Sequence, residues 1–209
     1  MLTKIEKISP LSAFAINNIK SSENSSMDFL SFREKLSLAN IGHPQKRKEW
    51  KAARLAIKNT LDNLELPYPG FYKDQHGKSH SMDGTGHVSL THHGDCAAAI
   101  FHKDMPVGID LESVREKTVP LGPKYLDPLE IDFLGKDPLL YTMAWSVKES
   151  IFKCQGKKGI SLRQNIILAP FTANDKIING KIHGSDFSDH YYQVVVHSEN
   201  DMVLTYTVW

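Results

Sequence analysis

Residues 107–112 read VGIDLE and carry the clearest local signal for both the fold and the chemistry of this chain. Apolar residues alternate with others through 105–111, as they do along a β-strand whose successive side chains point to opposite faces. We therefore predict a strand over 105–111. One face of it would carry Val107, Ile109 and Leu111, and the other Gly108, Asp110 and Glu112.

Asp110 and Glu112 would share one face of this strand, because a spacing of two returns to the same side. Paired hard oxygen donors suit Mg²⁺, and Gly108 beside them leaves room for a bulky ligand to approach the backbone. Two carboxylates that face water at a strand end produce the same pattern. The spacing alone therefore leaves both interpretations open.

The second informative segment, residues 145–153, reads WSVKESIFK and lies in a stretch of helical periodicity. We predict a helix over 141–155 that ends at Gly156. Glu149 and Lys153 stand one turn apart on one face of this helix, where they could hold a metal and a phosphate together or form an ordinary exposed ion pair. The apolar stripe of the helix would consist of Met143, Val147, Ile151 and Cys154.

Helices and strands are predicted on both sides of these two segments. The two halves of the chain, 1–104 and 105–209, therefore both contain them, and we expect an α+β protein with two similar lobes. The further elements are an amphipathic helix over 43–64, a strand over 88–91, a strand or buried run over 96–102, a short helix over 128–134, and a terminal hairpin from 191–197 and 202–209.

The composition favours a folded cytoplasmic protein. The chain has 209 residues, of which 41% are hydrophobic, and a formal net charge of +1. Such a balance gives no global field for nucleic acid or a membrane surface, and we expect neither a signal peptide nor a membrane span. Cys96 and Cys154 lack a CxxC pairing, which argues against a disulfide framework or a structural zinc site.

Candidate phosphate-binding groups lie in the first half of the chain. Residues 77–79 read GKS, but Tyr72 stands where a P-loop requires glycine, so a P-loop is excluded. Lys78 remains either a phosphate-binding charge or a solvated turn residue. The other candidates, for which packing or solvation is an equally good explanation, are Arg47, Lys51, Arg54, Thr91, His92 and His93.

Taken together and in order, these segments resemble the Sfp-type 4′-phosphopantetheinyl transferases. VGIDLE matches the family signature (V/I)G(I/V)DxE, and WSVKESIFK matches (F/W)SxKE(A/S)xxK. Upstream, KEWKAARLAIK, GKS and VSLTHHGDCAAAIF are similar to the family's arginine helix, GK turn and serine-histidine-serine segment. The resemblance extends from Lys46 to Lys153, and Thr91 and His93 depart from the usual serines.

The resemblance implies a holo-[acyl-carrier-protein] synthase activity, in which 4′-phosphopantetheine moves from coenzyme A to a serine of an apo acyl, peptidyl or polyketide carrier protein and 3′,5′-ADP is released. It implies that Mg²⁺, or Mn²⁺ in its place, is held by Asp110, Glu112 and Glu149. Glu149 and Lys153 would be the catalytic residues. Coenzyme A would be bound by Arg47, Arg54, Lys78, Thr91, His92 and Lys153.

The family fold implied by the resemblance has two lobes related by a pseudo-twofold axis, with the active site in the cleft between them. The lobe of residues 1–104 would bind the 3′-phosphate and adenosine of coenzyme A, and the lobe of residues 105–209 would bind Mg²⁺ and catalyse the transfer. We expect a monomer that acts on an acidic helical carrier domain, which Lys157 and Lys158 could meet, and no nucleic-acid or membrane partner.

Two other classes of function stay open. A non-catalytic module that binds coenzyme A or carrier protein would typically have lost one of the three acids, and all three are present. A metal-dependent nuclease or phosphoesterase also uses clustered acids and a lysine. Nucleases of the D…ExK kind, however, place the lysine two residues after the glutamate on a strand, whereas Lys153 follows Glu149 by four residues on a predicted helix.

Overall fold

The computed structural model describes residues 4–75, 77–156, 159–183 and 189–208. It contains helices and antiparallel sheets, so the predicted mixture of α and β structure is confirmed. The chain divides into two compact units, Met1–Val107 and Gly108–Trp209, which we call unit 1 and unit 2. Within the described ranges, every helix is too short or too polar to cross a membrane.

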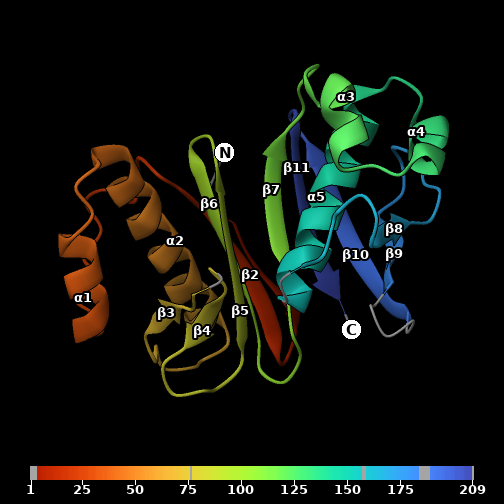
Figure 1. Ribbon diagram of the computed structural model, residues 1–209. Coiled ribbons are helices and arrows are strands. Elements are labelled where there is room, and N and C mark those ends of the chain that lie inside the picture. Colours follow the sequence, from red (N-terminus) through yellow and green to blue (C-terminus); the bar gives the residue numbers. More distant parts are fainter. Residues whose placement is uncertain (1–3, 76, 157–158, 184–188, 209) are drawn as a thin grey trace. The chain divides into compact units, whose positions relative to one another are not determined.

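Unit 1 consists of a four-stranded antiparallel sheet, in the order β1-β2-β6-β5, with a long helix packed on it and a small separate hairpin (Figure 1). The elements are β1 (Lys4–Ser9), β2 (Ser12–Asn18), α1 (Phe32–Ala39), α2 (Pro44–Asn63), β3 (Phe71–Lys73), β4 (Ser79–Ser81), β5 (His87–His93) and β6 (Cys96–His102).

Helix α2 lies close to this sheet because small side chains line both surfaces. Its start is fixed by Pro44 in the first turn and by the side chain of His43, which accepts a hydrogen bond from a backbone N–H. Ala52 and Ala53 of α2 share a buried cluster with Ala97 of β6. The helix that carries Arg54 is therefore held directly against the sheet.

Unit 2 consists of a five-stranded antiparallel sheet, in the order β7-β11-β10-β9-β8, on which the long helix α5 packs (Figure 1). Three short helices connect β7 to α5. The elements are β7 (Ile109–Ser113), α3 (Thr118–Leu121), η1 (Gly122–Lys124), α4 (Pro128–Leu134), α5 (Pro138–Gln155), β8 (Ile166–Leu168), β9 (Ile177–His183), β10 (Asp189–Glu199) and β11 (Met202–Val208).

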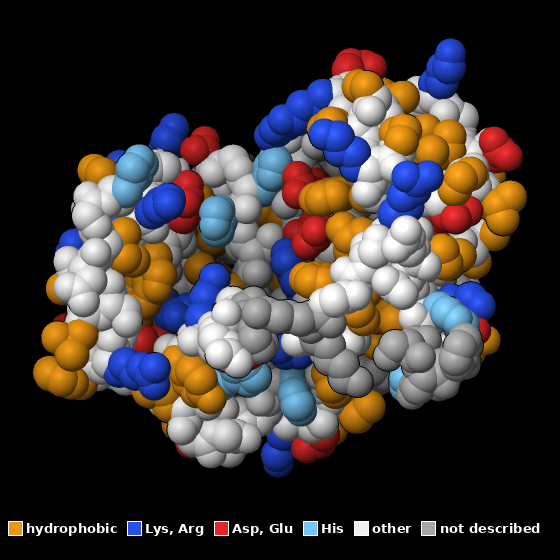
Figure 2. Space-filling model, in the orientation of Figure 1, with side chains coloured by type: hydrophobic (Ala, Val, Ile, Leu, Met, Phe, Trp, Pro, Cys, Tyr) orange, Lys and Arg blue, Asp and Glu red, His pale blue; other side chains and the backbone are white. Residues whose placement is uncertain are grey.

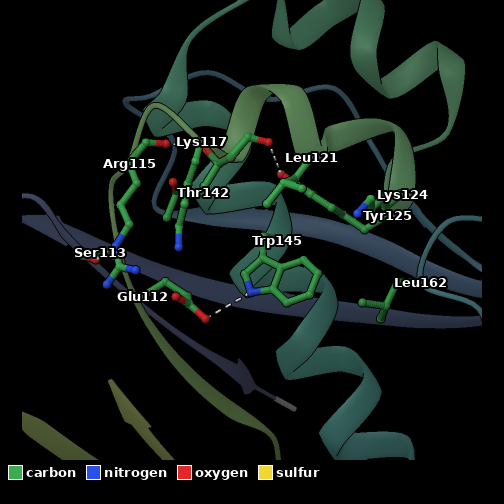
Figure 3. A pocket seen from close by; sticks show the side chains of 11 residues that line it. Glu112, Ser113, Arg115, Lys117, Leu121, Lys124, Tyr125, Thr142, Trp145 and Leu162 are labelled. Atoms are coloured by element: carbon green, nitrogen blue, oxygen red, sulfur yellow. Dashed lines mark hydrogen bonds between the residues drawn. The ribbon is translucent and has the colours of Figure 1, made fainter. Parts of the chain in front are cut away.

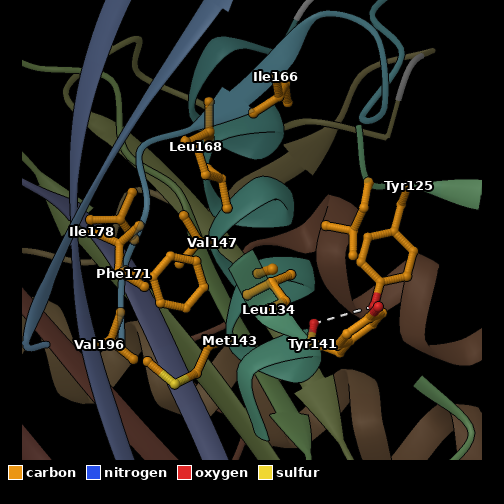
Figure 4. Packing of buried hydrophobic residues seen from close by; sticks show 14 of the residues in the cluster. Tyr125, Leu134, Tyr141, Met143, Val147, Ile166, Leu168, Phe171, Ile178 and Val196 are labelled. Atoms are coloured by element: carbon orange, nitrogen blue, oxygen red, sulfur yellow. Dashed lines mark hydrogen bonds between the residues drawn. The ribbon is translucent and has the colours of Figure 1, made fainter. Parts of the chain in front are cut away.

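The core of unit 2 forms where α5 meets the sheet (Figure 4). Met143 and Val147 of α5 are fully buried and lie among Phe171, Ile178 and Val196, which come from the opposite side of this core. Burying one such side chain stabilises the fold by about 1.5–3 kcal/mol. The apolar stripe predicted for this helix is therefore confirmed.

Most of the predicted elements are confirmed. The helices over 43–64, 128–134 and 141–155 correspond to α2, α4 and α5, and Asp137 starts α5 slightly earlier by capping it. The strands over 88–91 and 96–102 and the terminal hairpin are also present.

One strand prediction is wrong at its start. The strand expected over 105–111 is β7, which begins only at Ile109. Pro106 has no N–H to donate to a sheet, and it disfavours regular pairing where the prediction placed the first strand residues. Asp110 is only 3% exposed, because α5 packs on β7, so it is not a carboxylate that faces water at a strand end.

Candidate functional site

A seam of small side chains lets α5 lie directly against β7 and β11. A Cβ atom at Gly108 would lie 1.8 Å from the carbonyl oxygen of Ser150, so only glycine fits there. Next to it, the hydroxyls of Ser150 and Ser146 lie 2.7 and 2.9 Å from Thr205 Oγ1. These hydrogen bonds fix the rotation of α5, and with it the direction of Lys153 toward β7.

Asp110 and Lys153 form an ion pair between β7 and α5. Lys153 Nζ lies 2.6 Å from Asp110 Oδ1 and donates a second hydrogen bond, of 3.1 Å, to the carbonyl oxygen of Ile109. The carboxylate is buried, whereas the lysine side chain is 26% exposed. Burying a carboxylate costs free energy unless a cation or hydrogen-bond donors balance it, and Lys153 supplies that cation.

Glu112 is the second carboxylate of β7 and is held by a tryptophan of α5. Trp145 Nε1 donates to Glu112 Oε1 at 3.1 Å (Figure 3). Burial raises the pKa of Glu112 and the charge of Asp110 raises it further, while the Trp145 hydrogen bond and Lys153 lower it. Glu112 therefore binds a proton more readily than a solvated glutamate does.

Glu149 on α5 is the third carboxylate of the site. Burial raises its pKa, the charge of Lys153 lowers it, and the charges of Asp110 and Glu112 raise it. Asp110, Glu112 and Lys153 thus all act on the pKa of Glu149, as neighbouring charges do. We call Asp110, Glu112 and Glu149 the acidic cluster.

The chemistry of the acidic cluster fits a hard divalent cation. Three carboxylates supply the oxygen donors that Mg²⁺ and Mn²⁺ prefer, and Lys153 balances only part of their negative charge. In the part of the chain that the structure describes, no three His, Cys, Asp or Glu side chains are already arranged around a metal position. To bind a metal ion, the side chains of the acidic cluster would therefore have to change their orientation.

A cavity of about 570 Å³ opens beside Glu112 in unit 2 (Figure 3). Two of its walls are the rings of Trp145 and Tyr125, which meet edge to face with centroids 4.9 Å apart. We call this cavity the unit 2 pocket. Its other lining residues are Ser113, Arg115, Lys117, Thr118, Leu121, Lys124, Thr142 and Leu162.

A second cavity, of about 350 Å³, lies in unit 1 between α2, β5 and the end of β3, and we call it the unit 1 pocket. It brings together three of the predicted coenzyme A ligands, Arg54, Thr91 and His92. Lys46 and Lys73 line it as well, and both are exposed. The pocket thus presents hydroxyl, imidazole and ammonium donors, which are groups that bind phosphate.

Arg54 contributes less net charge to the unit 1 pocket than its type suggests. Arg54 Nε lies 2.7 Å from Glu34 Oε1, and both side chains are buried. The guanidinium group also stacks over Trp50, with its carbon 4.6 Å from the ring centroid. Because Glu34 balances Arg54, the other cationic side chains at the pocket are those of Lys46 and Lys73, and Glu49 adds one carboxylate to the lining.

The remaining predicted ligands lie elsewhere in the described chain. Arg47 is exposed on α2, and Lys78 lies in the β3–β4 turn, where its backbone N–H donates to Asp74 Oδ1 at 3.0 Å. Neither residue lines the unit 1 pocket. Lys157 and Lys158 are outside the described residues.

The site also contains residues that the sequence analysis did not select. Lys46, Trp50 and Arg54 recur every fourth residue on α2, so helical spacing was an available signal for the first two. Lys73 reaches the unit 1 pocket from another element, and no local pattern marks it. Trp145 belongs to a recognised motif, but its hydrogen bond to Glu112 spans two elements and has no sequence signal.

A comparison with protein families matches residues 106–207 to the model of the 4′-phosphopantetheinyl transferase superfamily. The matched segment contains the acidic cluster, Lys153 and the unit 2 pocket. No curated protein matches the chain.

Proposed function

We propose, from the match of residues 106–207 to the model of the 4′-phosphopantetheinyl transferase superfamily, that this protein transfers 4′-phosphopantetheine from coenzyme A to a serine of an apo carrier protein. The observation that carries the proposal is the acidic cluster with Lys153 inside the matched segment. The serine oxygen would bond to the β-phosphorus of coenzyme A. The bond from that phosphorus to the bridging oxygen would break, and 3′,5′-ADP would leave.

Two side chains of α5 would carry the chemistry. Glu149 would accept the proton of the serine hydroxyl, because its raised pKa makes it a stronger base than an ordinary glutamate. Lys153 would place a positive charge beside the phosphate oxygens as negative charge develops on them. Its hydrogen bond to the Ile109 carbonyl oxygen holds it in that region.

Asp110, Glu112 and Glu149 would hold Mg²⁺, or Mn²⁺ in its place. When bound, the ion supplies Lewis-acid stabilisation of the charge on the pyrophosphate. Trp145 would orient Glu112 for this role, because its N–H binds one carboxylate oxygen and leaves the other to face a ligand.

We assign the 3′-phosphate and adenosine of coenzyme A to the unit 1 pocket. The cations Lys46 and Lys73, together with Arg54, Thr91 and His92, support this assignment. Arg47 and Lys78 are proposed as additional phosphate ligands outside the pocket. Both units would serve the same coenzyme A molecule as the two pseudo-twofold-related lobes of one monomer, with residues 1–104 and 105–209 as the lobes.

The first test is the intact mass of an apo acyl carrier protein after incubation with this protein, coenzyme A and Mg²⁺, with a parallel sample containing EDTA. We expect a mass gain of one phosphopantetheine that EDTA abolishes. Peptidyl and polyketide carrier proteins are tested in the same way. No gain on any of them would contradict the proposed function.

The same samples separate the alternative functions. A non-catalytic module would bind coenzyme A in a titration without modifying any carrier. A phosphoesterase would release 3′,5′-ADP or phosphate from coenzyme A in the absence of a carrier.

A further inference from the structure

Helix α1 is attached to unit 1 through a charged residue. Glu34 is the one fully buried residue of this eight-residue helix. Phe32 and Leu36, which could have supplied apolar contacts, are 78% and 51% exposed. Figure 2 accordingly shows hydrophobic side chains on the surface over α1. A surface helix normally packs through an apolar stripe, so the reason for the packing of α1 has to be sought in the partners of Glu34.

The carboxylate of Glu34 joins three segments of unit 1. Its Oε2 accepts hydrogen bonds from the hydroxyl and the backbone N–H of Ser31, at 2.9 and 3.2 Å, at the start of α1. Its Oε1 accepts a hydrogen bond of 2.8 Å from the hydroxyl of Tyr68, in the connection between α2 and β3. The same oxygen lies 2.7 Å from Arg54 Nε on α2. Buried polar networks whose members are satisfied are rigid, so Glu34 has a defined position.

Tyr68 connects this network to the core of unit 1. Its ring meets the buried ring of Phe71 edge to face, with centroids 5.3 Å apart. Phe29 meets the ring of Tyr68 in the same manner at 4.8 Å. The hydroxyl of Tyr68 therefore holds Glu34 relative to the core, and not only relative to α1.

Arg54 is held on two sides and keeps donors for a ligand. Glu34 lies at its Nε, the ring of Trp50 lies against the guanidinium group, and the side chain is only 5% exposed. Within the described ranges, the buried Nε makes no well-aligned hydrogen bond, and the other nitrogens of Arg54 have no hydrogen-bond partner. Buried donors without acceptors cost free energy. Because Arg54 lines the unit 1 pocket, an anion there can supply these acceptors.

A phosphate monoester is the group that suits such an arginine. The planar guanidinium group can donate two parallel N–H···O bonds to two oxygens of one phosphate. Since Glu34 balances the charge of Arg54, the direction of these donors matters more for affinity than the bare charge does. A guanidinium group that is already held in place also loses less conformational entropy on binding.

We propose that Glu34 and Tyr68 are positioning residues that hold Arg54 for a phosphate monoester, and that they thereby set the preference of the unit 1 pocket for ligands with this group. Neither residue lines the pocket, so both act through Arg54. This inference rests on the proposed function, which assigns the 3′-phosphate of coenzyme A to this pocket.

The test compares two nucleotides that differ only in the phosphate monoester, 3′,5′-ADP and 5′-ADP. Each is titrated by calorimetry into the full chain, without carrier protein, and the ratio of the dissociation constants measures the preference. Glu34→Asp keeps the carboxylate but withdraws it from Arg54 by one methylene group, and Tyr68→Phe removes only the hydroxyl. We expect the preference for 3′,5′-ADP to fall about tenfold in Glu34→Asp and about threefold in Tyr68→Phe, as the loss of a charged and of a weaker contact implies. Affinity for 5′-ADP should stay within about twofold.

The controls separate positioning from stability. Aspartate is also favourable in the first turn of a helix, so Glu34→Asp should keep α1 in place, and thermal unfolding checks this. The matched controls are Glu65→Asp and Tyr191→Phe, at exposed positions outside the pocket, and both should keep the preference. A merely structural role of Glu34 would lower the stability and both affinities together, and would leave their ratio unchanged.

Arg54→Lys tests whether Glu34 acts through Arg54. Lysine keeps the positive charge but lacks the planar group that donates two parallel bonds. We expect Arg54→Lys to lower the preference about tenfold. Adding Glu34→Asp should then lower it by less than about twofold more, because no guanidinium group is left to orient. A further fall of the same size as in the wild-type background would overturn the positioning role.

The outcomes distinguish this inference from the proposed function. An unchanged preference in Glu34→Asp or in Tyr68→Phe removes that residue from the positioning role, whether or not a carrier is modified. Tighter binding of 3′,5′-ADP in Glu34→Asp also overturns it, because Glu34 would then compete with the ligand for Arg54. If the preference falls as expected but no carrier is modified, the proposed function fails and the positioning role stands. A wild-type chain that does not prefer 3′,5′-ADP overturns the positioning role, since no phosphate monoester is then recognised.

Discussion

Lys148 and Glu149 are consecutive residues, yet their side chains leave α5 in different directions. Lys148 is fully buried and donates to Glu130 Oε2 at 2.6 Å and to the carbonyl oxygens of Leu162 and Ile166 at 2.9 and 2.6 Å. Glu130 accepts two backbone N–H groups in addition. All three ammonium protons thus have acceptors. Lys148 belongs to the core of unit 2, and only Glu149 belongs to the acidic cluster.

Replacing Lys148 would therefore act on stability. Lys148→Met leaves Glu130 buried without its cation, and we expect unfolding in urea to show a loss of about 3–5 kcal/mol. The double variant Lys148→Met/Glu130→Gln should lose less than the sum of the single changes, because the pair is coupled. The control Lys176→Met, at an exposed position, should change stability by under about 0.5 kcal/mol. A loss below about 1 kcal/mol for Lys148→Met would contradict the importance of the pair.

Replacing Glu149 would act on turnover. Glu149→Gln keeps the shape of the side chain but removes its proton-accepting charge, so kcat should fall by about a hundredfold or more. Affinity for coenzyme A, measured by calorimetry without metal, should change much less. The exposed Glu199→Gln is the matched control. An unaltered turnover number would exclude Glu149 as the base and as an essential metal ligand.

Trp145→Phe separates the ring of this residue from its N–H. The phenyl ring preserves packing against Tyr125, but Glu112 loses its donor. We expect Mn²⁺ binding, followed by electron paramagnetic resonance, to weaken by about tenfold. Thermal unfolding should be nearly unchanged, and unweakened Mn²⁺ binding would show that Trp145 has only a packing role.

At the scale of elements, the site depends on how closely α5 approaches β7. The seam between them consists of Gly108, Ser146, Ser150 and Thr205, whose side chains are small or absent, and hydroxyl contacts replace apolar packing there. This close approach explains why the two motifs contain small residues that have no direct role in the chemistry. Glycine in VGIDLE and the two serines in WSVKES set the distance at which carboxylates of the two elements meet.

Gly108→Ala should move α5 away from β7. The new methyl group would overlap a backbone carbonyl, which cannot rotate aside, and we expect a stability loss of about 1–3 kcal/mol in urea unfolding. Transfer activity should fall further than the folded fraction does, because the carboxylates on α5 and β7 would lie farther apart. Gly42→Ala is the control, since a Cβ there meets nothing within 4 Å. Wild-type activity in Gly108→Ala would show that the seam does not set the site geometry.

The predictable elements are those with a strong local period. Helices α2 and α5 bury a stripe that recurs at helical spacing, and β10 alternates around the buried Val194 and Val196, whereas β11 is buried over 203–207. The short β8 has too few residues for a period, and β7 was extended too far because its apolar alternation continues through Pro106. The site residues that the sequence could predict are those that lie together within one motif. Pairs such as Lys148 with Glu130, or Trp145 with Glu112, form only through tertiary packing and leave no pattern in a single sequence.

At the scale of the whole molecule, the proposed function requires residues from both units. Unit 1 supplies a pocket with lysines, and unit 2 supplies the acidic cluster. Each unit has its own antiparallel sheet and its own long helix, so each has a separate framework for its residues. The proposed monomer requires both contributions to come from one chain.

Mixing inactive variants tests that requirement. Lys46→Glu/Lys73→Glu disables the unit 1 pocket at exposed positions, and Glu149→Gln disables unit 2. A mixture of the two proteins should remain inactive in the carrier mass assay, because neither chain holds a complete set. Mixtures of each variant with wild type provide the control and should be active in proportion to the wild type. Regained activity in the mixture of variants would show that chains share their sites.

The order of strands in unit 2 has a consequence for how the protein is made. Strand β7, which bears Asp110 and Glu112, pairs with β11, and β11 is the last strand of the sheet to be synthesised. While the ribosome is still adding the chain between them, β7 has no neighbour in its own sheet. The carboxylates therefore reach their final setting only after β11 has emerged, and a nascent chain stalled before residue 202 would lack the strand against which β7 is held.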